Sequence, residues 1–292
     1  MTDKSDDSVG IPPVEMEERL HEATRLGEED RWDEAFELLR ELEDDYPEDP
    51  LLLSMLGTVA GEMESRGLAY DYFRRGVAAQ PTDPGVLVAL GAGLARFDDP
   101  EAERVLRLAA ITAPELASAR FQYGVYLARE GMHELALREL SAARELEPRD
   151  PVVIRELGVV QWLSGTPDVA ATSLEEAAGL APEDTDGRLL AGLVLLSSGR
   201  VEEGAEEVIR VSAELPDEGE VQIVACLAAA VEGWQDEAWN ALARAEGALH
   251  AADADLVQET EDALEGGDVE ARRLLLNEVL PQLLHDRLFD RV

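Results

Sequence analysis

The sequence predicts an all-α solenoid of stacked helical hairpins, and three observations support this fold class. Six prolines recur at intervals of 33 or 34 residues in a chain of 292 residues. Each interval repeats the same spacing of apolar and small residues, and no stretch shows the strict alternation typical of strands. A hairpin of this length is too small to bury its own apolar face, so neighbouring hairpins must supply each other's core. The prolines are Pro47, Pro81, Pro114, Pro148, Pro182 and Pro216.

The two helices of each unit carry different apolar patterns. The first helix has a central apolar residue followed by a small one, as in Leu157-Gly158, and a small residue lets a neighbouring helix approach closely. The second helix has an apolar pair four residues apart, as in Ala136-x3-Leu140, which places both side chains on one face. We expect these two faces to pack against each other.

Local signals mark the ends of the helices. A proline cannot continue the second helix, and the Asp or Glu that follows it is suited to cap the next one. Four glycines, also 34 residues apart, fall where the first helix must end in a tight turn, a place that favours a residue tolerant of positive φ. These glycines are Gly131, Gly165, Gly199 and Gly233.

This pattern resembles the tetratricopeptide repeat family, whose unit reads W-x2-L-G-x2-Y, then A-x3-F, then P. The resemblance covers residues 16 to about 252 as seven units, of which the third is one residue short. It implies a right-handed superhelical solenoid with a concave surface that binds peptides. The expected units are 16–49, 50–83, 84–116, 117–150, 151–184, 185–218 and 219–252.

The two ends of the chain depart from the period. Residues 1–13 lack apolar periodicity, and we expect a disordered acidic tail. Residues 253–292 are expected to form C-terminal capping helices, because terminal repeats need a cap. Leucines recur there at a spacing of four, and Pro281 should bend the helix. The alternative is that this segment is a dimerisation or docking helix, which would allow a homodimer.

The chain is strongly acidic, with 64 acidic and 25 basic residues and a net charge of −39. Such a surface repels phosphate backbones, so we expect no nucleic-acid partner and no binding to anionic membranes. The sequence has no run of 18 apolar residues, so we expect no membrane insertion. It also has no recognisable signal peptide, and we therefore expect a cytoplasmic location. One explanation of this acidity is that it keeps the protein soluble or adapts it to high salt. The alternative is that it attracts a basic partner protein.

Catalytic constellations are not apparent in the sequence. The four histidines are scattered and have no zinc-ligand spacing, and the single cysteine, Cys226, occupies a small-residue position that predicts a buried, inert thiol. We therefore expect no enzyme activity, no metal site and no cofactor. The histidines are His21, His133, His250 and His285.

The resemblance implies that positions 2, 5, 9, 12 and 13 of each unit line the concave surface. These positions are largely apolar, which favours a groove for an apolar or amphipathic helix of a partner protein. The alternative is that the same residues bury one another or pack against the C-terminal helix. The predicted groove residues are Val88, Phe121, Val125, Val152, Val159, Trp162, Leu189, Leu193, Leu196, Ile223 and Leu227.

Three arginines fall on the same predicted face in consecutive units: Arg96, Arg129 and Arg155. A guanidinium there could anchor an acidic side chain or a C-terminal carboxylate of a partner. The alternative is structural pairing with the abundant carboxylates of the chain itself. The Lys and Asn pattern of the tetratricopeptide domains that clamp chaperone tails is absent from these positions.

Two functions follow from these observations. The first is a non-catalytic adaptor or scaffold whose groove holds a segment of another protein. The alternative is a dedicated chaperone that shields a hydrophobic client segment, similar to the acidic tetratricopeptide chaperones of type III secretion translocators. Those chaperones typically have three repeats, whereas seven units are expected here.

Overall fold

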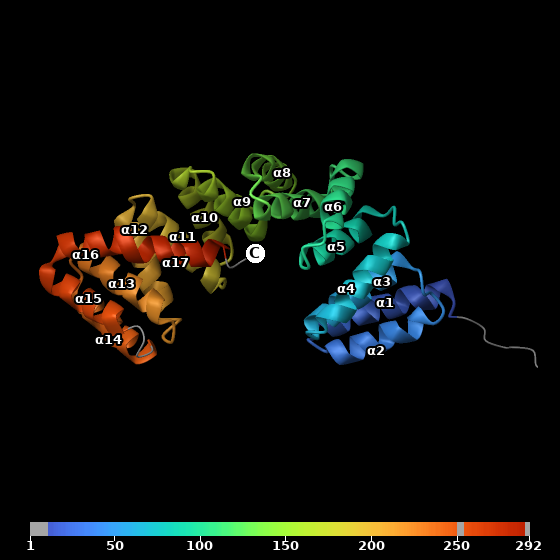
Figure 1. Ribbon diagram of the computed structural model, residues 1–292, viewed down its shortest axis with the longest axis horizontal. Helices are drawn as coiled ribbons and strands as arrows, with labels where there is room; N and C mark the ends of the chain where they lie inside the picture. The colour runs from blue at the N-terminus through green and yellow to red at the C-terminus, as the bar shows by residue number, and fades with distance from the viewer. Residues whose placement is uncertain (1–10, 250–253, 290–292) are drawn as a thin grey trace, which may run out of the picture. The chain divides into compact units, whose positions relative to one another are not determined.

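The computed structural model describes residues 11–249 and 254–289, and within these ranges the chain is helical and contains no strand (Figure 1). The chain divides into two compact units, Met1–Tyr126 and Leu127–Val292, and the division falls inside helix α7 (Ala117–Arg129). Each unit is described by itself below.

The N-terminal unit consists of helical hairpins. Its helices are α1 (Pro13–Glu28), α2 (Trp32–Glu43), α3 (Pro50–Glu62), α4 (Arg66–Ala78), α5 (Pro84–Ala95) and α6 (Glu101–Thr112). Each odd-numbered helix packs on the next even-numbered one, and α2 and α4 also pack on the hairpins that follow them. One buried apolar cluster runs through these helices.

The C-terminal unit has the same pattern and ends in four further helical segments. Its repeat helices are α8 (His133–Leu146), α9 (Pro151–Leu163), α10 (Pro167–Leu180), α11 (Thr185–Ser197), α12 (Val201–Ser212), α13 (Gly219–Val231) and α14 (Gln235–Ala248). They are followed by α15 (Ala254–Gly266), α16 (Asp268–Leu274), the π-helical turn η2 (Leu275–Val279) and α17 (Leu280–Phe289). Paired helices that stack on the next pair confirm the predicted fold class, a helical-hairpin solenoid.

Aspartate caps open several of the helices that begin a hairpin. At the start of α9, Asp150 accepts hydrogen bonds from the backbone N–H groups of Val152 (2.8 Å) and Val153 (3.2 Å), and Pro151 occupies the first helical position. These groups satisfy N–H donors that have no partner inside the helix. Equivalent caps open α3, α5 and α11 at Asp49, Asp83 and Asp184.

The turn inside each hairpin requires one residue with positive φ. Gly131 and the three glycines spaced 34 residues apart after it have φ between 71° and 87°, as the sequence predicted. The first three hairpins keep the same geometry without glycine, because Asp30, Glu64 and Asp98 have φ of 57°, 58° and 53°. An L-residue in this region is strained, so these three turns are less favourable than the later ones.

Small residues in the first helix of a hairpin allow close packing, also as predicted. A Cβ atom added at Gly158 would lie 2.8 Å from Leu174 of the facing helix α10, and one at Gly57 would lie 2.6 Å from Phe73 of α4. Any larger side chain would therefore force these helices or side chains apart.

A buried carboxylate joins the first two hairpins. Glu43 at the end of α2 accepts hydrogen bonds from Arg75 of α4 (2.7 Å) and from the Tyr72 hydroxyl (3.0 Å), and it also pairs with Arg40. Burial alone would raise the pKa of Glu43, but the hydrogen bonds from Arg75 and Tyr72 outweigh burial, so its pKa is lowered.

The described part of the N-terminal tail is held against the first hairpin. The Ile11 N–H donates to Asp45 (2.9 Å), the Tyr46 hydroxyl bonds the Ile11 carbonyl, and α1 begins at Pro13. The expected disordered tail of residues 1–13 therefore differs from the structure at residues 11–13. Residues 1–10 lie outside the described residues.

The helical segment near Pro281 contains an irregular turn. Proline has no N–H to donate to the carbonyl four residues earlier, and its ring crowds the preceding turn. The π-helical turn Leu275–Val279 lies directly before α17, and its wider backbone accommodates Pro281 as the second residue of that helix. The sequence predicts a bend at Pro281, and the irregularity that the structure has there is this π-helical turn.

Replacing Glu64 with glycine is expected to raise the free energy of unfolding by about 1 kcal/mol, because relief of the positive-φ strain exceeds the extra entropy of the unfolded chain. Asp71→Gly is the matched control, since it removes the same charge from the interior of α4. It should lower the free energy of unfolding by about 1 kcal/mol. Urea denaturation of both variants measures the difference, and a destabilised Glu64→Gly variant would contradict the strained turn.

Replacing Glu43 with glutamine should destabilise the protein by about 1 to 3 kcal/mol at pH 7, because the charge-assisted hydrogen bonds are lost. Since the pKa of Glu43 is lower in the folded state than in the unfolded state, its contribution is complete above the unfolded pKa. This stabilising contribution is lost as the pH falls through the pKa that Glu43 has in the folded state. The difference in the free energy of unfolding between wild type and variant, measured by urea denaturation, should therefore become smaller from pH 7 to pH 3.5.

Glu37→Gln, on an exposed position of the same helix, is the control and should change stability little at any pH. If the free energies of unfolding of wild type and Glu43→Gln differ by the same amount at every pH in this range, the ionised Glu43 is not the source of the stabilisation.

Candidate binding surface

Six of the predicted groove residues are buried by the chain itself, and five of these lie on α11 and α13. We call Leu189, Leu193 and Leu196 of α11 together with Ile223 and Leu227 of α13 the covered face. Each of these side chains is at most 1% exposed. They belong to one buried cluster that also contains the leucines of η2 and α17.

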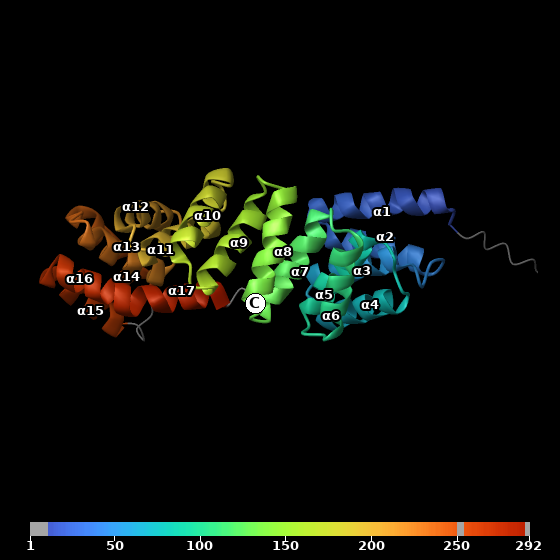
Figure 2. The same cartoon turned by 90° about the horizontal axis from the view of Figure 1, so that it is seen from above.

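The cover is formed by the segments that follow the last repeat hairpin. Helix α15 packs on both α13 and α14, α16 and η2 pack on α13, and α17 packs on α11. Both views show α17 running alongside α11 (Figures 1 and 2). The sequence left two alternatives for the groove residues, and for the covered face the structure supports burial against the C-terminal helix.

Helix α17 presents one apolar stripe to the covered face. We call its buried leucines, Leu280, Leu283, Leu284 and Leu288, the leucine stripe, and each is at most 3% exposed. Their positions i, i+3, i+4 and i+8 lie on one side of an α-helix. The stripe therefore packs against the apolar side chains of α11, and both belong to one buried cluster.

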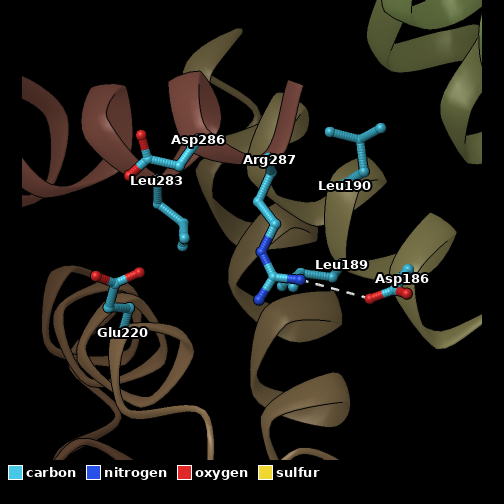
Figure 3. Close-up of a pocket in the computed structure, with 7 residues that line it drawn as sticks. All are labelled: Asp186, Leu189, Leu190, Glu220, Leu283, Asp286 and Arg287. Carbon is cyan, nitrogen blue, oxygen red and sulfur yellow. Dashed lines mark hydrogen bonds and ion pairs between the residues drawn. The ribbon is translucent and has the colours of Figure 1, made fainter. Parts of the chain in front are cut away.

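A single arginine fixes the polar end of this contact. Arg287 lies in the same helical row as the leucine stripe and pairs with Asp186 of α11 (3.5 Å; Figure 3). It also pairs with Glu218, the residue directly before α13. Its side chain is 31% exposed, so the pairs are partly shielded from water. The position of α17 is thus set by both apolar burial and charge.

A pocket of about 420 Å³ remains beside this contact. Its wall includes the carboxylates of Asp186, Glu220 and Asp286 together with Arg287 and three leucines (Figure 3). Three carboxylates thus share this space with one guanidinium. The leucines are Leu189, Leu190 and Leu283.

The groove residues predicted on α9 are more accessible. Val152 is 43% exposed and Trp162 is half-buried at the margin of the C-terminal cluster. Val159 is only 6% exposed and belongs to the core. The open apolar surface of the C-terminal unit is therefore smaller than the sequence predicts.

The predicted groove residues of the N-terminal unit are all half-buried: Val88 on α5, and Phe121 and Val125 on α7. Val88 packs at the edge of the N-terminal cluster. These three residues keep part of their apolar surface open, as a binding surface requires.

The three predicted arginine anchors have different surroundings. Arg96 is open, with 60% of its side chain exposed and only a distant contact to Glu62 (3.8 Å). Arg129 is half-buried in the last turn of α7. Arg155 pairs with Asp184, the residue that caps α11, which agrees with the structural alternative for that arginine.

A second pocket, of about 410 Å³, lies in the N-terminal unit, and the sequence analysis missed it. Arg66 stacks over the Phe97 ring at 5.4 Å, and Arg96 and Phe73 complete the wall with residues of α3 and α4. Arg66 and Phe97 follow the turns of two successive hairpins. They occupy different repeat positions, so no periodic signal in the sequence marks this pocket.

The remaining polar chemistry of the described residues is modest. Burial raises the pKa of the Cys226 thiol to about 12, which agrees with an inert thiol. No cluster of His, Cys, Asp and Glu side chains in the described ranges has the geometry of a metal site. In the same ranges, no helix has the length and apolarity needed to span a bilayer.

Comparison with known proteins identifies the fold. No family model matches the chain, and no curated protein matches it. TTC0263, a thermophilic tetratricopeptide-repeat protein of Thermus thermophilus, is similar in structure with a TM-score of 0.51 and 26% identity, covering 62% of this chain and 98% of that one. PilW, a type IV pilus biogenesis factor, has a TM-score of 0.63 and 18% identity, covering 70% of this chain and 96% of that one.

The repeat spacing, the paired helices and these structural likenesses together show that the chain has the tetratricopeptide-repeat fold.

Replacing Leu284 with alanine is expected to lower the free energy of unfolding by about 2 to 5 kcal/mol, because the side chain is buried in the contact with the covered face. Val152→Ala, at an exposed apolar position, should change it by less than about 1 kcal/mol. Thermal or urea denaturation measures both. Equal, small effects would mean that α17 does not cover the repeats.

Proposed function

We propose that the chain is a non-catalytic interaction scaffold that binds an apolar or amphipathic segment of a partner protein. The observation that carries the proposal is the set of apolar residues left accessible at the predicted groove positions outside the covered face. Val152 and Trp162 are accessible in the C-terminal unit. Val88, Phe121 and Val125 are accessible in the N-terminal unit.

These residues support binding of a partner segment for two physical reasons. Exposed apolar surface beside polar residues is costly in water and is often retained because a partner covers it. Helices of a repeat array also offer parallel rows of side chains, against which the apolar face of an amphipathic helix packs. The open guanidinium of Arg96 adds a polar contact for an acidic group of the same partner.

The charge of the chain supports a partner that is basic overall. A net charge of −39 attracts such a protein over several ångströms and raises its association rate at low salt. Solubility or adaptation to high salt is the alternative origin of this acidity. A cytoplasmic location also stays a prediction.

The covered face favours a scaffold over a dedicated chaperone. A chaperone for membrane-active segments needs its most apolar surface open to the client. Here five of the predicted groove positions are covered by α17 and its neighbouring segments of the same chain. Burial of the leucine stripe likewise favours a capping role of the C-terminal segment over homodimer formation through it.

Substitution of the open apolar residues with glutamate should reduce partner capture about tenfold or more, since burying an unpaired carboxylate opposes binding. Phe121→Glu tests the N-terminal unit, and Val152→Glu and Trp162→Glu test the C-terminal unit. Partners captured by the wild-type chain are identified by mass spectrometry, purified and titrated against each variant.

The matched control is Trp239→Glu, because Trp239 is 42% exposed on α14 and lies outside the predicted binding positions. It should leave binding unchanged, and circular dichroism establishes that each variant is folded. If folded Phe121→Glu, Val152→Glu and Trp162→Glu variants all bind as the wild type does, the proposed surface is wrong.

A further inference from the structure

We infer that the covered face is a second docking site, that its partner is an amphipathic helix with a basic residue in its apolar row, and that α17 occupies this site in the unbound chain. This inference rests on the proposed scaffold function and specifies a partner segment for it. The supporting observations are the burial of the α17 leucines and the ion pairs of Arg287.

The covered face is shaped for one helix. Four leucines of α17, at positions i, i+3, i+4 and i+8, are buried in the same cluster as α11 and α13. A ligand with the same apolar spacing buries the same surface, since helix-in-groove recognition depends on this row of anchors and not on the rest of the helix. The stripe therefore serves as a template for the apolar part of the partner.

The polar end of the face selects for positive charge. Asp186 and Glu218 both pair with Arg287, which is position i+7 of the same row. A partner helix without a basic residue there would leave two carboxylates without their counter-ion next to an apolar contact. An Arg or Lys at this position is therefore part of the recognition pattern.

Helix α17 is an imperfect occupant of the face. It leaves a pocket of about 420 Å³ between itself and helices α11 and α13. Asp286, whose carboxylate accepts hydrogen bonds from Gln282 of the same helix (3.0 Å), lines this pocket together with Asp186 and Glu220, so three carboxylates border the space. A helix with a basic side chain at the position of Asp286 would fill the pocket and replace repulsion with attraction.

The backbone before α17 offers a place for release. The π-helical turn Leu275–Val279 and Pro281 interrupt regular helical hydrogen bonding between α16 and α17. Helices α15 and α16 and the turn η2 pack on α13, whereas α17 packs on α11, so release of α17 breaks only its own contacts. A partner helix therefore replaces α17 without exposing the rest of the core.

The recognition pattern is then specific. It has apolar residues at i, i+3, i+4 and i+8, a basic residue at i+7, and a second basic residue at i+6 where α17 carries Asp286. The competitor in the same chain is always present at high effective concentration, so only a better helix binds.

Fluorescent peptides of residues 275–289 test the inference on the purified full-length chain by fluorescence anisotropy. One peptide has the native sequence, a second carries Asp286→Arg and a third carries Arg287→Glu. On the wild-type chain the Asp286→Arg peptide should bind at least about tenfold more tightly than the native peptide, and the Arg287→Glu peptide should bind more weakly than both.

Two variants of the full-length chain complete the design. Leu288→Ser loosens α17 and should raise the affinity for the native peptide at least about tenfold, because the internal competitor is weakened. Glu218→Arg reverses the charge of the face and keeps the leucine stripe intact. On this variant the Arg287→Glu peptide should become the tighter ligand, which holds even if Leu288→Ser fails to fold.

The inference is overturned if no peptide binds saturably to any folded chain, or if the order of peptide affinities is the same on wild type and Glu218→Arg. Either result leaves the scaffold function intact where partner capture still depends on Phe121, Val152 and Trp162. Conversely, peptide binding with the predicted charge reversal supports the docking site even if those three residues prove neutral.

Discussion

The structure depends on one constraint: no hairpin of this chain can bury its own apolar face, so every face needs a neighbour. Close approach of the helices makes this burial effective, and residues such as Gly158 permit it because a Cβ there would meet Leu174 at 2.8 Å. The constraint acts along the whole array and is most severe where the repeats end. The last hairpin has no following hairpin to cover it.

The segment after the last repeat covers the exposed apolar faces in two ways. Helix α15 takes the place of a next hairpin against α13 and α14. The chain then turns back, and α17 lies against α11 with its leucine stripe in the core and Arg287 paired with Asp186. One continuous segment thus both caps the last hairpin and covers part of the predicted groove positions. A feature required for stability therefore also determines which of the predicted groove residues stay accessible.

Much of the fold could be predicted because it is written in local, periodic signals. The proline period, the aspartate caps and Gly131 with its equivalents each act within one hairpin, and the structure has them where the sequence places them. The left-handed turn residues Asp30 and Glu64 were missed, since tertiary packing imposes a geometry there that the residue types do not favour.

The state of the binding surface could not be decided in the same way. Leu189 must be apolar whether a partner or the chain's own helix covers it, so its identity does not distinguish the two. The deciding contacts join residues about a hundred positions apart, as between Arg287 and Asp186, and no repeat signal encodes them. The pocket beside Arg66 and Phe97 was missed for a related reason, because it forms only where two hairpin turns meet.

The most direct test of this account is a methyl nuclear Overhauser experiment on the full-length chain with labelled leucine and isoleucine. The account predicts cross-peaks that connect leucine methyl groups of α17 with those of α11, since both belong to one buried cluster. Methyl groups of α17 with random-coil shifts and no cross-peaks to α11 would show that the repeats are not covered by their own chain, and would contradict it.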